Sequence, residues 1–148
     1  MKTKIPPPIL AILMIGLVYL SSLLIKSLNF DYQASLSVLL IIIGLACALP
    51  YFRLFARYKT TISPFAPSET AVLLTEGMYR YLRNPMYLGL LLTIIAASIW
   101  FGTWLGIVIS TIFVLLINFL QIIPEDEVLL EIFGEEYQEY KKKVRRWI

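Results

Sequence analysis

Uncharged, largely apolar runs alternate with short charged segments along the chain. The runs cover residues 5–25, 34–52 and 86–123, which are 21, 19 and 38 residues long. A helix needs about 20 apolar residues to cross a bilayer core about 30 Å thick. The third run would be about 57 Å long as a helix, so it predicts two spans. We expect its break at Phe101-Gly102-Thr103-Trp104, because glycine permits a turn and aromatic residues favour the membrane interface.

This pattern predicts an all-α integral membrane protein with four transmembrane helices arranged as two hairpins. Residues 1–148 form a single domain in this interpretation, with spans at about 5–25, 34–52, 86–101 and 104–123. A cytoplasmic loop covers 53–85 and a cytoplasmic tail covers 124–148. A cleaved signal peptide is the alternative for the first run. We favour a retained span, because the run exceeds the usual apolar core of about 7–15 residues and no A-x-A cleavage site follows it.

Apolar and aromatic residues of the tail recur at spacings of 3 and 4, which is typical of one face of an amphipathic helix. Pro124 suits the first turn of such a helix, and the acidic residues beside it suit its positive end. Gly134 interrupts the pattern, so we expect one amphipathic cytoplasmic helix or two short ones. The face consists of Leu129, Leu130, Phe133, Tyr137, Tyr140, Val144 and Trp147.

The basic residues gather in three segments that an even number of spans places on one side. The N-terminus, the 53–85 loop and the tail hold twelve of the 13 basic residues, and Lys26 is the exception. Basic loops face the cytoplasm, so we expect both termini there. The net charge of +3 therefore indicates topology and contact with membrane lipids rather than a nucleic-acid partner.

Composition narrows the class further. The chain is 59% hydrophobic and only 16% charged, with a mean hydropathy of +0.77, which excludes a soluble, disordered or collagen-like protein. It has no histidine and one cysteine, Cys47, so triad hydrolysis, a zinc site and a disulfide framework are all disfavoured, and we expect no metal. The predicted spans contain no carboxylate, which disfavours an ion-coupled exchanger.

Two polar segments flank the last two predicted spans. Arg83 and Asn84 precede Pro85 at the start of the third span, and Asn84 is a natural N-cap. Glu125-Asp126-Glu127 follows the fourth span. A hairpin brings both segments to the same end, so we expect them to touch. A helix N-terminus with an arginine would then face carboxylates across a pocket, an arrangement that suits a zwitterionic cofactor.

Structural explanations compete with a cofactor pocket for these residues. Arg80 and Arg83 would also be explained by topology alone, and the acidic segment by the helix dipole. Aromatic residues at this depth are ordinarily interfacial, and the basic run 141–146 is ordinarily solvated or in contact with lipid headgroups. The aromatic stripe of the tail would ordinarily be packing. The interfacial candidates are Tyr79, Tyr81 and Tyr87.

Residues 74–89, LTEGMYRYLRNPMYLG, resemble the signature of membrane methyltransferases related to isoprenylcysteine carboxyl methyltransferase and phospholipid methyltransferases, roughly L-V-x-x-G-x-Y-x-x-x-R-[HN]-P-x-Y-x-G. Residues 125–140, EDEVLLEIFGEEYQEY, resemble the ending E-E-x-x-L…F-G-x-x-Y-x-x-Y of that family. Residues 60–64 also resemble a segment that often precedes the signature. The likeness covers about residues 53–148.

The resemblance implies a methyltransferase that uses S-adenosylmethionine, with a lipophilic acceptor entering from the bilayer. We expect the protein in a bacterial inner membrane. Arg83 and Glu125 would act in the transfer itself. Asn84 stands where the family often has histidine, which weakens a link to prenyl-cysteine substrates, and Asp126 replaces a glutamate. By position, the cofactor pocket would comprise Gly77, Tyr79, Arg83, Asn84, Pro85, Tyr87, Glu125 and Asp126.

The acceptor stays open at this point. A carboxylate is already ionised at neutral pH and needs no base, whereas a thiol or an amine would need help from Glu125, Asp126 or Tyr87. Two other functions remain: a nicotinamide-dependent membrane reductase of the sterol type, and a small membrane transporter or assembly protein. The sequence also leaves the oligomeric state open.

Overall fold

The computed structural model describes residues 5–25, 29–58 (50–58 by backbone alone) and 73–147. Every regular element in these ranges is helical, which confirms the predicted all-α class. A 3₁₀-helix η1 (Gly77–Arg80) precedes α3, and a π-helix η2 (Asn118–Ile122) joins α4 to α5. The α-helices are α1 (Pro7–Leu24), α2 (Gln33–Tyr58), α3 (Pro85–Trp100), α4 (Leu105–Ile117) and α5 (Ile123–Lys143).

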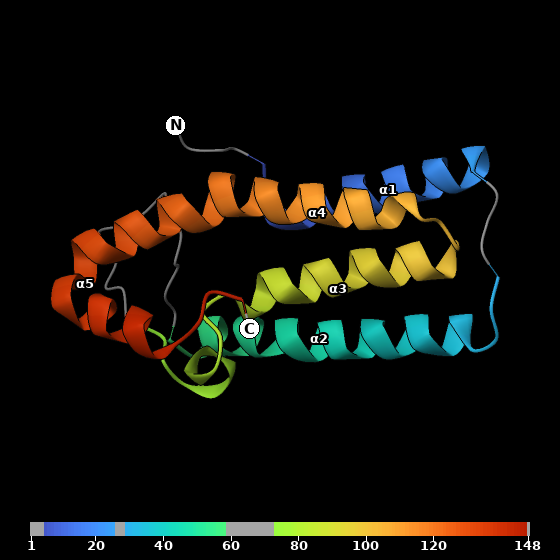
Figure 1. Ribbon diagram of the computed structural model, residues 1–148. Helices are drawn as coiled ribbons and strands as arrows, with labels where there is room; N and C mark the ends of the chain where they lie inside the picture. Colours follow the sequence, from blue (N-terminus) through green and yellow to red (C-terminus); the bar gives the residue numbers. More distant parts are fainter. Residues whose placement is uncertain (1–4, 26–28, 59–72, 148) are drawn as a thin grey trace.

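Four of these helices run alongside one another, and α3 packs against α1, α2 and α4 (Figure 1). The helices α2 and α3 approach almost backbone to backbone, since a Cβ added to Gly89 would lie 2.5 Å from the carbonyl oxygen of Gly44. Small residues permit this close packing between apolar helices. The core between α1, α3 and α4 is apolar and includes Val18, Ile94 and Phe113, each 0% exposed.

The turn between α3 and α4 lies where the sequence predicts it. Gly102 adopts a φ of 63°, a left-handed conformation that glycine tolerates without strain. The side chain of Gln33 ties this end of the bundle together, because its Nε2 donates to the carbonyls of Ile99 and Trp100 at 2.6 and 2.9 Å. These two carbonyls belong to the last turn of α3, and that of Ile99 also accepts from the amide of Gly102 at 2.9 Å.

Among the described residues, two helical stretches are long and apolar enough to cross a bilayer. They are α1 and the continuous stretch Leu105–Lys143, which comprises α4, η2 and α5. The apolar parts of α2 and α3, Gln33–Leu49 and Pro85–Trp100, are shorter. Outer faces of the bundle are apolar too, and Ile12, Leu23 and Leu24 are 65–86% exposed. This surface suits contact with lipid rather than water.

Helical structure extends six residues beyond the predicted end of the second span. Helix α2 continues to Tyr58, so residues 53–58 of the predicted loop are helical. The change from apolar to basic residues at Arg53 marks a change of environment, and such a change does not by itself end a helix. The segment 60–64 of the family resemblance lies outside the described residues.

The tail forms the predicted amphipathic helix, and Gly134 reverses its direction. At Gly134 the backbone takes φ 52° and ψ −120°, which is strained for any residue with a Cβ. The second half of α5 therefore folds back toward the start of α3 (Figure 1). Val144 and Trp147, which the periodicity placed on the helical face, lie beyond the end of the helix, and Val144 has an extended backbone. This reversal brings the end of the chain to the polar site.

Candidate active site

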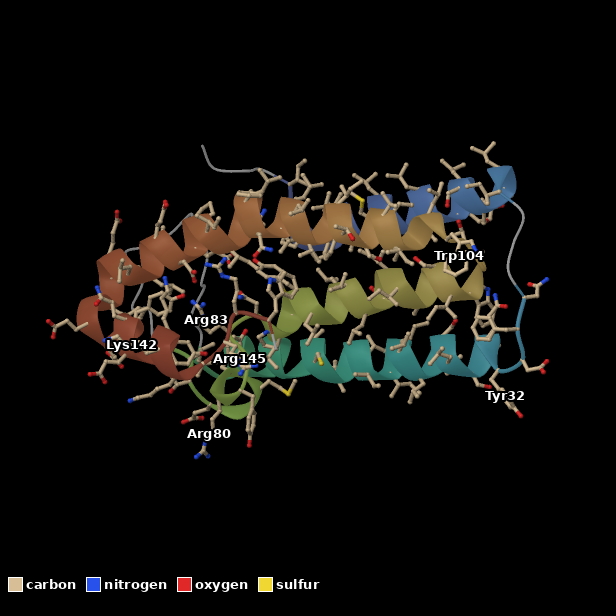
Figure 2. All side chains as sticks on the ribbon, viewed as in Figure 1. Tyr32, Arg80, Arg83, Trp104, Lys142 and Arg145 are labelled. Atoms are coloured by element: carbon tan, nitrogen blue, oxygen red, sulfur yellow. The ribbon has the colours of Figure 1, made fainter. Side chains whose placement is uncertain are left out.

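The segment before α3 directs some side chains into the protein and others into solvent. Gly77 starts η1 with a φ of 62°, which accounts for glycine at this position. Tyr79 is buried and Tyr81 is 73% exposed. Figure 2 shows Arg80 pointing away from the bundle, whereas Arg83 points toward α5. Only 10% of the Arg83 side chain is exposed, so this arginine is more than a topology signal.

Asn84 flanks the N-terminus of α3 as predicted, but its side chain makes no capping hydrogen bond. Its Nδ2 instead donates to the carbonyl oxygen of Arg146 at 3.0 Å. Asn84 therefore joins the start of α3 to the end of the chain.

Asp126 joins the two predicted segments, which confirms that they touch. Its Oδ1 accepts from Nη1 of Arg83 at 3.1 Å, and its Oδ2 lies 3.2 Å from Nη2 of Arg146 and 3.7 Å from Nζ of Lys141. The hydroxyl of Tyr137 also donates to Oδ1. Asp126 is 8% exposed, so these partners stabilise a charge that burial would otherwise penalise. The cluster holds three cations against one carboxylate.

Glu125 has a separate partner. The hydroxyl of Tyr87, on α3, donates to its Oε1 at 2.6 Å. Burial raises the pKa of Glu125 to about 7, although the Tyr87 hydrogen bond lowers it and the Asp126 charge raises it. A carboxyl group with a pKa near neutrality can accept and release a proton under physiological conditions. Glu125 and Asp126 are neighbours in sequence, yet they differ in chemistry. Asp126 has three cationic partners, whereas Glu125 has the hydroxyl of Tyr87.

A pocket opens between these groups. Seven of the eight residues that the resemblance assigns to a cofactor pocket line it, and Gly77 does not. Its free volume is about 70 Å³. Arg83 is one of the lining residues, and its Nε–H is buried and has no hydrogen-bond partner among the described residues. Six further residues complete the lining: Leu73, Leu74, Met86, Leu129, Tyr137 and Tyr140.

Sequence reasoning assigned several of these residues to other roles. Tyr137 and Tyr140 were expected only to pack, but the Tyr140 hydroxyl donates to the carbonyl of Tyr79 at 2.5 Å and Tyr137 binds Asp126. Burial raises the pKa of both, that of Tyr140 to about 12. Their Y-x-x-Y spacing was a usable signal, since it belongs to the family ending. Lys141 and Arg146 were expected to be solvated, and the reversal at Gly134 that brings them to Asp126 leaves no mark in the charge pattern.

Residues 144–147, which we call the C-terminal strap, cross the start of α3. The amide of Arg83 donates to the carbonyl of Arg145 at 2.9 Å, and Leu82 pairs with Arg145 in an isolated parallel bridge. The indole Nε1 of Trp147 donates to Oδ1 of Asn118 in η2 at 3.3 Å. A π-helical turn inside a long helix often marks a functional site. Here it turns the Asn118 side chain to meet the strap.

The fold and the site define an all-helical membrane-type protein with a charged, tyrosine-lined pocket at one end of the bundle. The family model described as phospholipid methyltransferase matches residues 32–136, which is more than half of the chain. The protein therefore belongs to this family of membrane methyltransferases, as its two motifs indicate.

Individual relatives agree with this assignment. The chain is 25% identical over 128 residues to a protein-S-isoprenylcysteine O-methyltransferase of Schizosaccharomyces pombe, covering 83% of this chain and 52% of the relative. It is 30% identical over 96 residues to methanethiol S-methyltransferase 1 of Bradyrhizobium diazoefficiens, covering 64% and 32%. An uncharacterized protein of Haemophilus influenzae is 48% identical over 66 residues, 43% of this chain and all of the relative. The chain thus spans about half or less of the two named methyltransferases.

Proposed function

We propose that this protein is an integral membrane enzyme that transfers a methyl group from S-adenosylmethionine to a lipophilic or membrane-associated acceptor. The observation that carries the proposal is that Arg83 lines a pocket between the two family motifs and that its buried Nε–H has no hydrogen-bond partner among the described residues. A buried donor without a partner costs about 1–3 kcal/mol. An anionic group of a ligand would satisfy it, and the excess of cations around Asp126 favours such a group.

The residues of the pocket match the chemical groups of this cofactor. Its carboxylate suits Arg83, and its positively charged ammonium and sulfonium suit Glu125 and the faces of the tyrosines. When bound, S-adenosylmethionine supplies an electrophilic methyl group. A free volume of about 70 Å³ is small beside ligand pockets of about 300–1,000 Å³, so the side chains around it would move apart on binding.

The protein itself contributes orientation and one base. Methyl transfer is an in-line displacement, so an enzyme gains most from holding the two reactants in line in a site that excludes water. If the acceptor is a thiol or an amine, Glu125 accepts its proton, because a pKa of about 7 leaves a large share of the group ionised at neutral pH. A carboxylate acceptor needs no such step. By their names, the two methyltransferase relatives modify an oxygen of an S-isoprenylcysteine and the sulfur of methanethiol.

We further propose that α1 to α4 all cross the bilayer, with the site at the cytoplasmic end. The largely apolar outer faces of the helices and the positions of the basic residues support this placement. In Figure 2 Tyr32 and Trp104 lie at the end of the bundle opposite Arg80 and Lys142. Lipophilic acceptors would then reach the pocket sideways from the membrane, and membrane lipids would surround the rest of the bundle.

Labelling of single cysteines tests this topology. Replacing the buried Cys47 by serine gives a cysteine-free background, into which Tyr32→Cys, Arg80→Cys and Lys142→Cys are introduced one at a time. An impermeant maleimide should label Tyr32→Cys in intact cells, and the other two only in inverted vesicles. Labelling of all three from one side would contradict the four-span placement. Tyr32 is 83% exposed, so slow labelling there would not arise from burial.

An acceptor screen tests the activity. Purified full-length protein in lipid nanodiscs is incubated with methyl-labelled S-adenosylmethionine and with prenylated cysteines, small thiols, amines or phospholipids in turn. The proposal predicts label in the organic phase with at least one acceptor class. Reduction of a sterol-type double bond with a nicotinamide cofactor, without any methyl transfer, would overturn it in favour of a membrane reductase.

A further inference from the structure

The ion pair between Arg83 and Asp126 is made by one terminal nitrogen of the guanidinium, Nη1. An arginine and a carboxylate commonly pair side-on, with two parallel N–H···O bonds. Here the only group of Arg83 that contacts the carboxylate is Nη1, at 3.1 Å from Oδ1 and 3.4 Å from Oδ2. The Nε–H, which a side-on pair would use, is buried and has no partner among the described residues.

The partners on the other side of Asp126 explain this geometry. Nη2 of Arg146 lies 3.2 Å from Oδ2, and the hydroxyl of Tyr137 occupies Oδ1. Lys141 also faces Oδ2, at the longer distance of 3.7 Å. With both oxygens already engaged, the carboxylate has no open edge on which Arg83 could place two of its nitrogens.

We propose that Arg146 is a positioning residue that keeps Arg83 available for the ligand. By occupying Oδ2 of Asp126, Arg146 prevents a side-on Arg83–Asp126 pair and leaves the buried Nε–H of Arg83, a residue of the pocket wall, without a partner among the described residues. Arg146 does not touch the ligand in this scheme and acts through Asp126 alone. The inference rests on the proposed function, since it takes the anionic group of S-adenosylmethionine as the partner of Arg83.

The strap holds Arg146 in place from both sides. The carbonyl of Arg146 accepts from Nδ2 of Asn84 at 3.0 Å. The preceding residue, Arg145, pairs through its backbone with Leu82 and Arg83. On the other side Trp147 contacts Asn118 and packs against the apolar core. A side chain supported in this way loses little further freedom when it binds Asp126, which favours the contact.

The test compares Arg146→Gln with Lys142→Gln. Lys142 is an exposed basic residue of the same tail, and Figure 2 shows it at the surface. Equilibrium binding of labelled S-adenosylmethionine to the purified protein should weaken about tenfold in Arg146→Gln, as expected for coupled neighbours. It should stay unchanged in Lys142→Gln. In the acceptor assay, the KM for the cofactor should rise more than kcat falls.

A double-mutant cycle separates positioning from a merely structural role. In an Asp126→Asn background the amide no longer attracts Arg83, so adding Arg146→Gln should weaken cofactor binding no further. An equal loss in both backgrounds, or no loss in the single variant, would overturn the inference. Failure of the wild-type protein to bind S-adenosylmethionine would instead overturn the proposed function, so the two failures are distinguishable.

Discussion

Replacing Arg83 by glutamine should weaken the binding of S-adenosylmethionine by about 100-fold, equivalent to about 2.7 kcal/mol. The substitution removes the buried Nε–H and the positive charge that we assign to the carboxylate of the cofactor. Hydrogen bonds to charged groups contribute about 1.5–3 kcal/mol, and the methyl transfer rate should fall at least as far. Isothermal titration calorimetry on the purified variants measures the affinity directly.

Arg80→Gln is the matched control for this prediction. Arg80 lies three residues earlier and points into solvent, so its loss should leave cofactor binding unchanged (Figure 2). Arg83→Gln should also remain folded, because Asp126 keeps Arg146, Lys141 and the Tyr137 hydroxyl as partners. A variant with wild-type thermal stability and wild-type affinity would contradict the assignment of Arg83 to the pocket.

The second large effect concerns Glu125 and pH. With a thiol or amine acceptor, kcat/KM should fall as the pH drops below about 7, because protonation of Glu125 removes the base. Glu125→Gln should abolish this acid limb and lower kcat/KM by about 10²–10⁴. Glu127→Gln changes an exposed carboxylate of the same turn and should keep the wild-type profile. A carboxylate acceptor should show no acid limb near pH 7, so the profile also identifies the acceptor class.

Tyr87→Phe should shift the acid limb of the pH profile in a defined direction. The Tyr87 hydroxyl donates to ionised Glu125 and so lowers the pKa of Glu125 from the value that burial alone would impose. Without this donor the pKa should rise, and the acid limb should move to higher pH. A limb that moves to lower pH, or one that persists in Glu125→Gln, would show that another group titrates.

The sequence predicted the helical class, the α3–α4 turn and the meeting of the two motifs. These features depend on hydrophobic runs and on glycine, which act over short distances along the chain. The pairing of Arg83 with Asp126 was within reach, because a hairpin must bring its two ends together. Hydrophobic periodicity could not separate Glu125 from Asp126, since their difference arises from Tyr87 on one side and three cations on the other.

The position of the end of the chain could not be predicted from the sequence. A regular helix through Gly134 would carry the basic run away from the site, and the charge pattern alone is typical of lipid-headgroup contact. The positive φ at Gly134 turns the helix back, so that Arg146 meets Asp126 and Trp147 meets Asn118. Glycine in a helix pattern signals that a break is possible, but the direction of the chain after it depends on tertiary contacts.

The proposed use of S-adenosylmethionine is tested most simply by equilibrium binding of the labelled cofactor to the purified full-length protein. A reduced nicotinamide cofactor serves as the competitor. We expect one saturable site with an affinity in the range of about 1 μM–1 mM typical of enzyme substrates, unaffected by the nicotinamide cofactor and weakened about 100-fold in Arg83→Gln. Saturable binding of the nicotinamide cofactor, with no binding of S-adenosylmethionine by the folded wild-type protein, would contradict it.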